Sequence, residues 1–365
     1  MISKRAKMLD ASGIRKVFDL AAALEEPVNL SIGQPDFDVA DNVKEEAINW
    51  IRSGFNKYTV TQGIPELADE VRGYYQRRFN VELDRILITS GVSGGLTLAF
   101  FALFDEGDEA IVFDPYFVMY KHLIHLVGGV PIFVDTYPDF RITAEALEKA
   151  LSSRTKAIII NSPANPTGAV LTPDEVKLVA DFADAHNLLL ISDEIYEQFT
   201  YDADPVTAAQ FTKNALILNG LSKLGGMTGW RVGYAAGPDE LIERMTMIQQ
   251  YTFVCAPAFA QKAAMVALQN DTTDTIAAYK RKRGIVYDGL KERFNVTKPA
   301  GAFYIFPEAP GRDADKFVRR AIENNVLIIP GNVFSEKNTH FRISFAATDE
   351  TLQEGVRILS GLCTG

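Results

Sequence analysis

One lysine has an unusual setting for a charged side chain. Lys223 lies in the segment NGLSKLGGMTGWRVGY (219–234), where its close neighbours are leucines and glycines, and Arg231 follows eight residues later. A surface lysine usually has polar neighbours, so this segment is expected to be partly buried and tightly turned. Because Lys223 follows the apolar run ALILNG (215–220), its amine is expected at the end of a buried strand, where ligands bind in open α/β sheets.

A carboxylate occupies a similar position in the sequence. Asp193 ends the strongly apolar run LLLISD (188–193), and Tyr196 follows three residues later, within the same turn. A buried carboxylate needs a cationic partner or several hydrogen bonds, which makes Asp193 a candidate site residue. The alternative is that Asp193 only caps a helix, but the unbroken apolar run before it favours burial.

The segment SGVSGG (90–95) follows the apolar run RILIT and precedes the helical pattern LTLAFFALF. A strand, a glycine-rich turn and a helix N-terminus can form an anion site. The free backbone N–H groups of Val92 and Ser93 would point outward, and the helix dipole favours a phosphate. The segment matches neither the Walker A loop nor the full G-x-G-x-x-G motif. An ordinary strand–helix turn remains the alternative.

Aromatic and amide side chains follow two other apolar runs. In PYFVMY, Phe117 or Tyr116 could lie flat over a ligand ring, and core packing is the alternative. In SPANPTG (162–168), two prolines and a glycine fix the backbone around Asn165, whose amide could donate to a ligand oxygen. The alternative for Asn165 is an Asx-type turn.

Together these strand ends carry the parts of one binding site. They supply an anion cradle, an aromatic face, an amide, a buried carboxylate, a tyrosine, a lysine and an arginine. Such a set suits a cofactor with a phosphate, a flat ring, a ring nitrogen that needs a proton, and an aldehyde that reacts with a lysine. Pyridoxal 5′-phosphate has all four features, and enzymes hold it through a lysine Schiff base and a partner for the pyridine nitrogen.

The elements that must position these residues follow from the apolar pattern. Short, continuous apolar runs alternate with amphipathic helical segments such as 94–104, 173–186 and 238–250. This alternation is typical of an α/β fold with a largely parallel sheet covered by helices on both faces. Seven runs are predicted as strands, at residues 85–90, 109–114, 130–135, 156–161, 188–193, 215–220 and 232–237.

The two ends of the chain have a different pattern, which predicts a second, smaller α+β domain. We expect an N-terminal segment (1–40) that packs with the small domain, a large domain (41–270) and the small domain itself (271–365). Helical periodicity outside the sheet region predicts helices at 14–24, 41–53, 65–79, 272–293, 313–324 and 349–362.

Composition argues against several other classes of protein. Hydrophobic residues make up 47% of the 365 residues, and no apolar run reaches the ~18 residues of a membrane helix. The net charge of −10 disfavours broad binding to nucleic acid or to acidic membranes. Two cysteines and no signal-peptide pattern predict a cytoplasmic protein. His122 and His125 could share a helix face, but no further ligands stand beside them, so no metal is expected.

The chain resembles the class I/II aminotransferases, which are fold-type I pyridoxal-phosphate enzymes similar to aspartate aminotransferase. The resemblance covers almost the whole chain. GLSKLGGMTGWRVG (220–233) matches the specific lysine motif of class I throughout. Five further stretches occur in family order with family-like spacing: GQPDF (33–37), YTVTQGIPELADEV (58–71), NPTG (165–168), SDEIY (192–196) and FRISFA (341–346).

This resemblance implies roles for particular residues. Lys223 would form the Schiff base with the cofactor aldehyde, Asp193 would pair with the pyridinium nitrogen, and Phe117 would stack on the ring. Tyr196 and Asn165 would bind the 3′-oxygen of the ring. The phosphate would be held by Gly91, Val92, Ser93, Ser222 and Arg231, and by Tyr58 of the other subunit. The substrate α-carboxylate would be bound by Arg342, with Gly33 and Asn165 nearby.

The same resemblance implies a doubly wound, mostly parallel sheet of seven strands, in which VGYAAG (232–237) runs antiparallel, and a homodimer with shared sites. It also implies that an amino group passes from an L-amino acid to a 2-oxo acid by a ping-pong mechanism. One position departs from the family pattern. Many members have a phosphate-binding serine three residues before the lysine, where this chain has Gly220.

Two other functions fit parts of the sequence. A C–S β-lyase, or another fold-type I reaction, would use the same Lys223 and Asp193, so the sequence separates it poorly from transamination. A pyridoxal-phosphate-binding regulatory domain would be expected to follow a DNA-binding segment, whereas this chain begins almost directly at the fold and is acidic. No second arginine can be assigned to an acidic substrate side chain, so the two substrates stay open.

Overall fold

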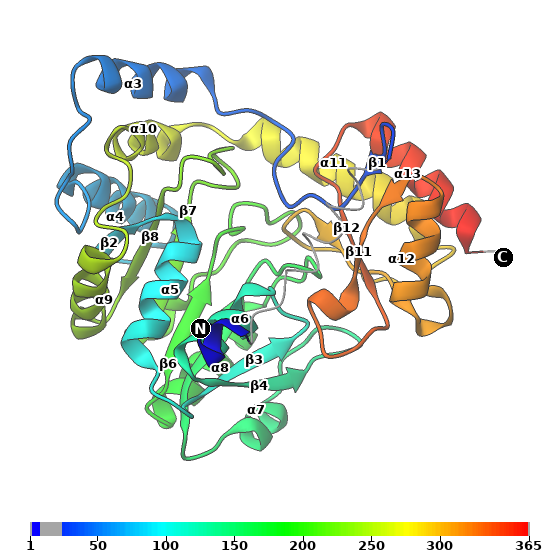
Figure 1. Ribbon diagram of the computed structural model, residues 1–365, viewed down its shortest axis with the longest axis horizontal. Helices are drawn as coiled ribbons and strands as arrows, with labels where there is room; N and C mark the ends of the chain where they lie inside the picture. Colours follow the sequence, from blue (N-terminus) through cyan, green and yellow to red (C-terminus); the bar gives the residue numbers. More distant parts are fainter. Residues whose placement is uncertain (1, 8–23, 364–365) are drawn as a thin grey trace.

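The computed structural model describes residues 2–7 and 24–363. Figure 1 shows two parts, one built on a large sheet and one formed by the C-terminal elements together with the strand β1. The helix expected at 14–24 lies outside the described residues, apart from Leu24. None of the described helices is both long and apolar enough to cross a membrane.

The large sheet has seven strands, as predicted. Its order is β2-β8-β7-β6-β5-β3-β4, and only β8 runs antiparallel to its neighbours. The continuous apolar runs form strands because both faces of the sheet are covered, so most of their side chains are buried. The strands are β2 (Arg85–Thr89), β3 (Glu109–Asp114), β4 (Val130–Asp135), β5 (Thr155–Asn161), β6 (Leu189–Asp193), β7 (Ala215–Gly220) and β8 (Gly233–Gly237).

Helices cover the sheet on both faces, which makes the fold doubly wound (Figure 1). One face packs against α5 (Gly91–Leu103), α6 (Met119–Val127) and α9 (Asp239–Tyr251). The hydrophobic core on the other face includes side chains of α3 (Asp41–Arg52), α4 (Pro65–Phe79), α7 (Ala144–Ala150), α8 (Pro173–Ala185) and α10 (Ala258–Gln269). The start of α8 is fixed by a capping box between Thr172 and Glu175, as its sequence TPDE favours.

The C-terminal part has its own aromatic-rich core. An antiparallel sheet of β11 (Ile329–Pro330), β12 (Phe341–Ser344) and β9 (Tyr304–Ile305) lies beside α11 (Thr273–Leu290), α12 (Ala314–Glu323) and α13 (Asp349–Leu362). The N-terminal stretch joins this part, because β1 (Val28–Asn29) pairs in parallel with β10 (Val326–Leu327). The domain boundaries near residues 40 and 270 stay a prediction. Within residues 2–7 and 24–363, the remaining elements are α1 (Lys4–Lys7) and three short 3-10 helices, η1 (Ala208–Gln210), η2 (Pro310–Arg312) and η3 (Gly331–Val333).

This topology brings distant segments to one edge of the large sheet. Strands β2, β3, β5, β6 and β7 run in the same direction, so their carboxyl ends lie together. The C-terminal part adds β9 and β12 on the opposite side of that edge. The space between the two parts is therefore where the predicted site residues can meet.

Candidate active site

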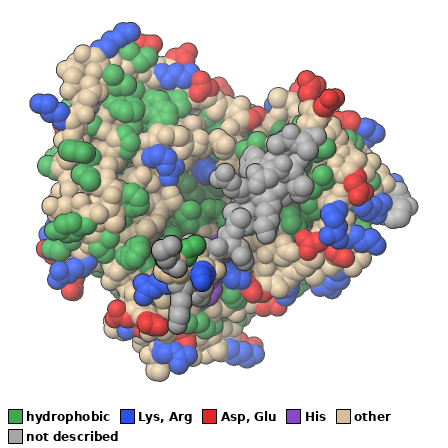
Figure 2. All heavy atoms as spheres, in the orientation of Figure 1, with side chains coloured by type: hydrophobic (Ala, Val, Ile, Leu, Met, Phe, Trp, Pro, Cys, Tyr) green, Lys and Arg blue, Asp and Glu red, His purple; other side chains and the backbone are tan. Residues whose placement is uncertain are grey.

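A cavity of about 340 Å³ lies between the carboxyl ends of the large sheet and the C-terminal part. The surface is hollowed at this place in Figure 2, with hydrophobic side chains inside the hollow. Among the residues that the structure describes, three cationic side chains and one carboxylate line this cavity, and this excess of positive charge favours anionic ligands. Eleven predicted site residues line it: Gly33, Val92, Ser93, Phe117, Asn165, Asp193, Tyr196, Ser222, Lys223, Arg231 and Arg342.

Two predicted residues are absent from the described wall of this cavity. Gly91 lies behind it, against the guanidinium of Arg231. Tyr58 is 84% exposed on the surface of the chain. Because Tyr58 does not line the cavity of its own chain, its expected role depends on a second subunit.

The amine of Lys223 lies just beyond the end of β7. Its Nζ donates to the carbonyl oxygen of Gly33 at 2.7 Å. Burial and the nearby positive charge of Arg342 lower the pKa of Lys223 to about 8, against the opposing effect of Asp193. A sizeable fraction of this amine is therefore unprotonated near neutral pH, unlike that of a solvent-exposed lysine.

The carboxylate of Asp193 ends β6 and is 2% exposed. Its Oδ2 accepts a hydrogen bond from the Tyr120 hydroxyl at 2.6 Å, and its Oδ1 accepts one from the backbone N–H of Ile195 at 3.3 Å. Burial raises the pKa of Asp193 to about 6, while both hydrogen bonds and the charge of Lys223 act in the opposite direction. Asp193 is therefore mostly ionised at neutral pH in a buried site.

Two asparagines connect β6, the strand that ends at Asp193, to Arg342 across the cavity. Asn161 donates to the carbonyl oxygen of Asp193 at 2.9 Å and accepts from the backbone N–H of Asn165 at 2.9 Å. The side-chain oxygen of Asn165 accepts from Arg342 at 3.0 Å. Because that oxygen is occupied, the group that Asn165 can offer a ligand is its amide N–H, a hydrogen-bond donor.

Arg342 comes from β12 and is 1% exposed. Its guanidinium lies between the rings of Tyr304 and Phe334, 4.5 Å from each ring centre. It donates to the Asn165 side chain and to the backbone oxygen of Ser31, at 2.8 Å, but its Nε has no partner among the described residues. No described carboxylate forms an ion pair with it. A buried cation without an anion costs free energy, so this arrangement favours an anionic ligand.

The opposite corner of the cavity holds Arg231, whose backbone has the left-handed φ of 57°. Its guanidinium donates to the Ser93 hydroxyl at 2.7 Å, in the first turn of α5. Gly91 also has a left-handed φ of 68°, and a Cβ at that position would lie 2.6 Å from Nη2 of Arg231. Glycine is therefore required there, and a basic side chain meets a helix N-terminus that binds anions.

The glycine at position 220 has a similar explanation. A Cβ on Gly220 would lie 2.8 Å from the Cα of Gly233 on the neighbouring strand β8. The backbones of β7 and β8 therefore approach too closely for the serine that the family resemblance would place at this position. Ser222, which is buried and lines the cavity, is the hydroxyl that this chain offers instead.

Of the two aromatic candidates after β3, only Phe117 lines the cavity. The ring of Tyr116 stacks on Phe133, with centres 4.7 Å apart, and its hydroxyl donates to Glu336 at 2.6 Å. Phe117 contacts Tyr120 edge to face, with ring centres 5.7 Å apart. Tyr116 therefore belongs to the contact between the two parts of the chain.

The sequence alone missed two tyrosines of the site. Tyr304 on β9 lines the cavity, and its hydroxyl lies 2.9 Å from that of Tyr196. Tyr120 lies behind the wall, bound to Asp193. A signal existed for Tyr120, because it follows Phe117 by three residues and must lie on the same side of a helical turn. Tyr304 had no comparable signal, since it lies in an ordinary buried strand.

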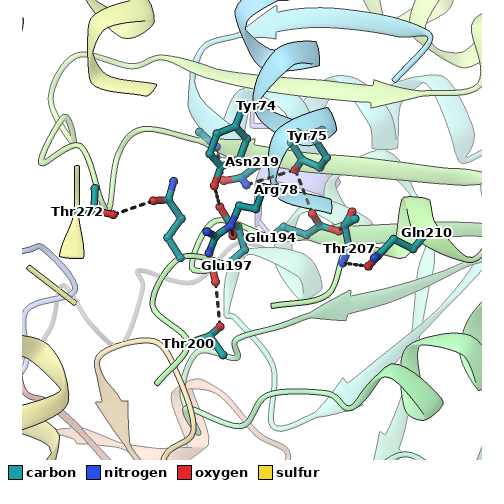
Figure 3. A network of polar contacts seen from close by, with 12 residues as sticks. Tyr74, Tyr75, Arg78, Glu194, Glu197, Thr200, Thr207, Gln210, Asn219 and Thr272 are labelled. Atoms are coloured by element: carbon teal, nitrogen blue, oxygen red, sulfur yellow. Dashed lines mark hydrogen bonds and ion pairs between the residues drawn. The ribbon is translucent and has the colours of Figure 1, made fainter. Parts of the chain in front are cut away.

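A buried polar network behind the cavity holds the segment that carries Asp193 and Tyr196 (Figure 3). Glu194 accepts hydrogen bonds from Tyr75 at 3.1 Å and from the backbone of Ala208 at 3.1 Å, with further bonds from Ser192 and Thr207. Burial raises the pKa of Glu194 to about 7. Glu197 binds Arg78 at 2.8 Å and the Tyr74 hydroxyl. Both carboxylates thus tie the segment to α4.

Comparisons with known proteins agree with this fold. The model of the family described as aminotransferase class I and II matches residues 25–359. The chain is 38% identical to a probable aspartate aminotransferase of Methanocaldococcus jannaschii, over 98% of this chain and 99% of that protein. It is 35% identical to the aromatic-amino-acid aminotransferase 2 of Thermococcus litoralis, over 97% of this chain and 96% of that protein.

Solved structures give the same result. A single mutant of the aspartate aminotransferase of Thermus thermophilus superposes with a TM-score of 0.96 and 32% identity, covering 99% of each chain. The chain therefore belongs to the class I/II aminotransferase family and has the fold-type I architecture. It is an aminotransferase, as its sequence motifs predicted.

Proposed function

We propose that the cavity binds pyridoxal 5′-phosphate on Lys223 and that Arg342 binds the α-carboxylate of an L-amino acid and, in the second half-reaction, of a 2-oxo acid. One observation carries the proposal. Arg342 is a buried guanidinium without an anionic partner among the described residues, and it faces the same cavity as a lysine with a lowered pKa and a buried carboxylate.

The residues present fit this cofactor. Arg231, Ser93, Ser222 and the first turn of α5 would hold the phosphate, because a cationic fork and free N–H groups meet there. Asp193 would hold a proton on the ring nitrogen, and Phe117 would cover one face of the ring. The Asn165 amide and the Tyr196 hydroxyl would donate to the ring oxygen, and Tyr58 of the second subunit would reach the phosphate.

When bound, pyridoxal 5′-phosphate supplies an aldehyde that joins amines and a ring that accepts the electron pair of a broken Cα–H bond. The chain supplies the proton transfers. Lys223 would be the base that takes the proton from the substrate Cα and the acid that gives it back in the reverse direction. Its pKa of about 8 suits both directions near neutral pH. Tethering it beside the reacting carbon removes most of the entropy cost.

Arg342 would orient the substrate so that its Cα–H bond faces the lysine. A planar guanidinium between two aromatic rings has one fixed orientation, which suits a two-pronged contact with a carboxylate. Because Tyr304 also contacts Tyr196, the carboxylate site and the cofactor-oxygen site share one wall. The same Arg342 accepts amino and oxo acids in turn, as ping-pong exchange requires.

The proposal includes a homodimer, in which each subunit completes the other's site. Large hydrophobic side chains are exposed near Tyr58 and at the end of α9, and Figure 2 shows hydrophobic side chains spread over this side of the molecule. Gln249 on α9 joins the two regions, because its side-chain amide donates to the carbonyl oxygen of Thr61 at 2.6 Å. The exposed residues are Ile51, Tyr58, Val60, Met247, Tyr251, Phe253 and Val254. Both cysteines are free, which fits the cytoplasmic location that we also propose.

The test has two steps. The purified protein is mixed with pyridoxal 5′-phosphate, reduced with borohydride and digested, and we expect the label on Lys223. Each L-amino acid is then added to the loaded protein without an oxo acid, starting with aspartate and the aromatic amino acids, and conversion to pyridoxamine phosphate is followed by absorbance. Lys223→Ala is expected to abolish both results. Labelling of a different lysine, or pyruvate release from L-cystathionine with no half-reaction, would contradict the proposal.

A further inference from the structure

Tyr120 makes the shortest side-chain contact with the carboxylate of the site. Its hydroxyl donates to Oδ2 of Asp193 at 2.6 Å, and both side chains are 2% exposed. The two residues lie 73 positions apart, on α6 and β6. Tyr120 does not line this cavity; it lines a smaller neighbouring pocket of about 50 Å³ that also contacts Phe117 and Asn165. Its contacts with the residues of the cavity are those with Asp193 and with the ring of Phe117.

We propose that Tyr120 is a positioning residue, which fixes the orientation and the negative charge of Asp193 for the ring nitrogen of the cofactor. This inference rests on the proposed function, because it assumes that Asp193 faces that nitrogen. The hydroxyl occupies one lone pair of Oδ2, and the Ile195 N–H occupies one of Oδ1. A carboxylate has about four such positions, so others remain free for a ligand while rotation of the group is prevented.

The surroundings of Asp193 leave this role mainly to Tyr120. The titratable groups near Asp193 are Tyr120 from α6, Lys223 from the loop after β7, and Tyr196 on the segment that follows β6. The Tyr196 hydroxyl is bound to that of Tyr304, and Lys223 would be tied to the cofactor. Among the described side chains, Tyr120 is thus the one that donates directly to the carboxylate. Burial and Asp193 raise the pKa of Tyr120 well above its usual value, so it remains a donor at any working pH.

The same tyrosine also supports the aromatic wall. Its ring meets that of Phe117 at an interplanar angle of 82°, and its backbone N–H donates to the Phe117 carbonyl at 3.1 Å. One helical turn therefore places the stacking ring and the partner of Asp193 together. A shift of this turn would change both the plane of the cofactor ring and the position of its nitrogen contact.

The chain provides a matched control in the same segment. Tyr116 is buried, comes from the same connection after β3, and also donates to a carboxylate at 2.6 Å. Its partner is Glu336, outside the cavity. Tyr116→Phe removes a hydroxyl of the same kind without touching Asp193, whereas Tyr120→Phe removes the proposed contact and keeps the ring against Phe117.

The experiment measures the dissociation constant of pyridoxal 5′-phosphate from the full chain between pH 5 and 9, by absorbance, for the wild type and both variants. Tyr120→Phe is expected to weaken binding about tenfold at neutral pH and to move the acid-side fall in affinity upward by about one pH unit. Tyr116→Phe is expected to match the wild type. In an Asp193→Asn background, Tyr120→Phe is expected to cause no further change.

Two results would overturn the inference. One is a Tyr120→Phe profile that coincides with those of the wild type and Tyr116→Phe. The other is an equal loss of affinity from Tyr120→Phe in the Asp193→Asn background. If Tyr120→Phe does not fold, 3-fluorotyrosine at position 120 keeps the contact and strengthens the donor. With 3-fluorotyrosine, the pH below which cofactor affinity falls must then shift downward. An unchanged pH profile of affinity refutes the positioning role of Tyr120. Failure of the wild type to bind the cofactor would instead refute the proposed function.

Discussion

Replacement of Arg342 by methionine should separate catalysis from stability. The side chain lies between Tyr304 and Phe334, 4.5 Å from each ring, and methionine can keep much of that apolar packing. The substitution removes the proposed two-pronged contact with the substrate carboxylate. Hydrogen bonds to charged groups contribute about 1.5–3 kcal/mol each, so two of them correspond to a loss of about 10²–10⁴ in kcat/KM.

The stability of the ligand-free protein should change little. Arg342→Met gives up two charged hydrogen bonds, to Asn165 and to the Ser31 backbone, at about 1.5–3 kcal/mol each. It also removes a buried cation that has no anionic partner among the described residues, and relief of that desolvation offsets the loss. We expect a net change in the free energy of unfolding of about 1 kcal/mol or less, against the 2–5 kcal/mol typical of a truncated core residue.

The assay combines steady-state kinetics with urea unfolding of the cofactor-free chain. Arg342→Lys is the comparison, because it keeps the charge but lacks the planar fork, and it should fall between the wild type and the methionine variant in kcat/KM. The affinity for pyridoxal 5′-phosphate should stay within a few-fold of the wild type. A methionine variant that loses less than tenfold in kcat/KM, or that unfolds as readily as a cavity mutant, would refute the reasoning.

Three further predictions follow from buried groups near the site. The pKa of Glu194 in the folded protein is about 7, above its usual value, so the free energy of unfolding should fall as pH rises from about 4.5 to 7. In urea titrations, Glu194→Gln should remove up to about 3 kcal/mol of that fall. Parallel pH profiles for the wild type and the variant would contradict this. The rate at which the cofactor-free chain binds pyridoxal 5′-phosphate covalently should increase with pH, with a midpoint near the Lys223 pKa of about 8. Arg342→Met should shift this midpoint to higher pH, because a positive charge near Lys223 is lost. Gly220→Ser should lower the melting temperature, because the added Cβ meets the Cα of Gly233; calorimetry that finds equal or greater stability would refute the steric explanation.

Much of the fold could be predicted from local pattern. The seven strands of the large sheet were found to within one residue at each end, because each is a continuous apolar run bounded by turns or helices. The antiparallel direction of β8 came from family resemblance, since periodicity does not encode strand direction. The helix expected at 14–24 stays a prediction, because it lies outside the described residues. The roles of the site residues also stay predictions until they are tested.

The sequence by itself determined which residues stand at the strand ends. Lys223 and Asp193 were found because an apolar strand followed by a lone polar residue is a local signal. The family assignment likewise rested on contiguous motifs. These features depend on neighbours along the chain, and burial of a strand fixes where its last residue must lie.

Only the tertiary structure decided how those residues are supported. Tyr120 meets Asp193 across 73 residues, and Arg342 meets Asn165 across 177. No periodicity links such positions, because their approach depends on strand order and on the packing of the C-terminal part against the sheet edge. Hydrogen bonding and charge in the buried site follow from those long-range contacts. The chain thus encodes its reactive groups locally, while the environment that sets their protonation and orientation arises only when the two parts fold together.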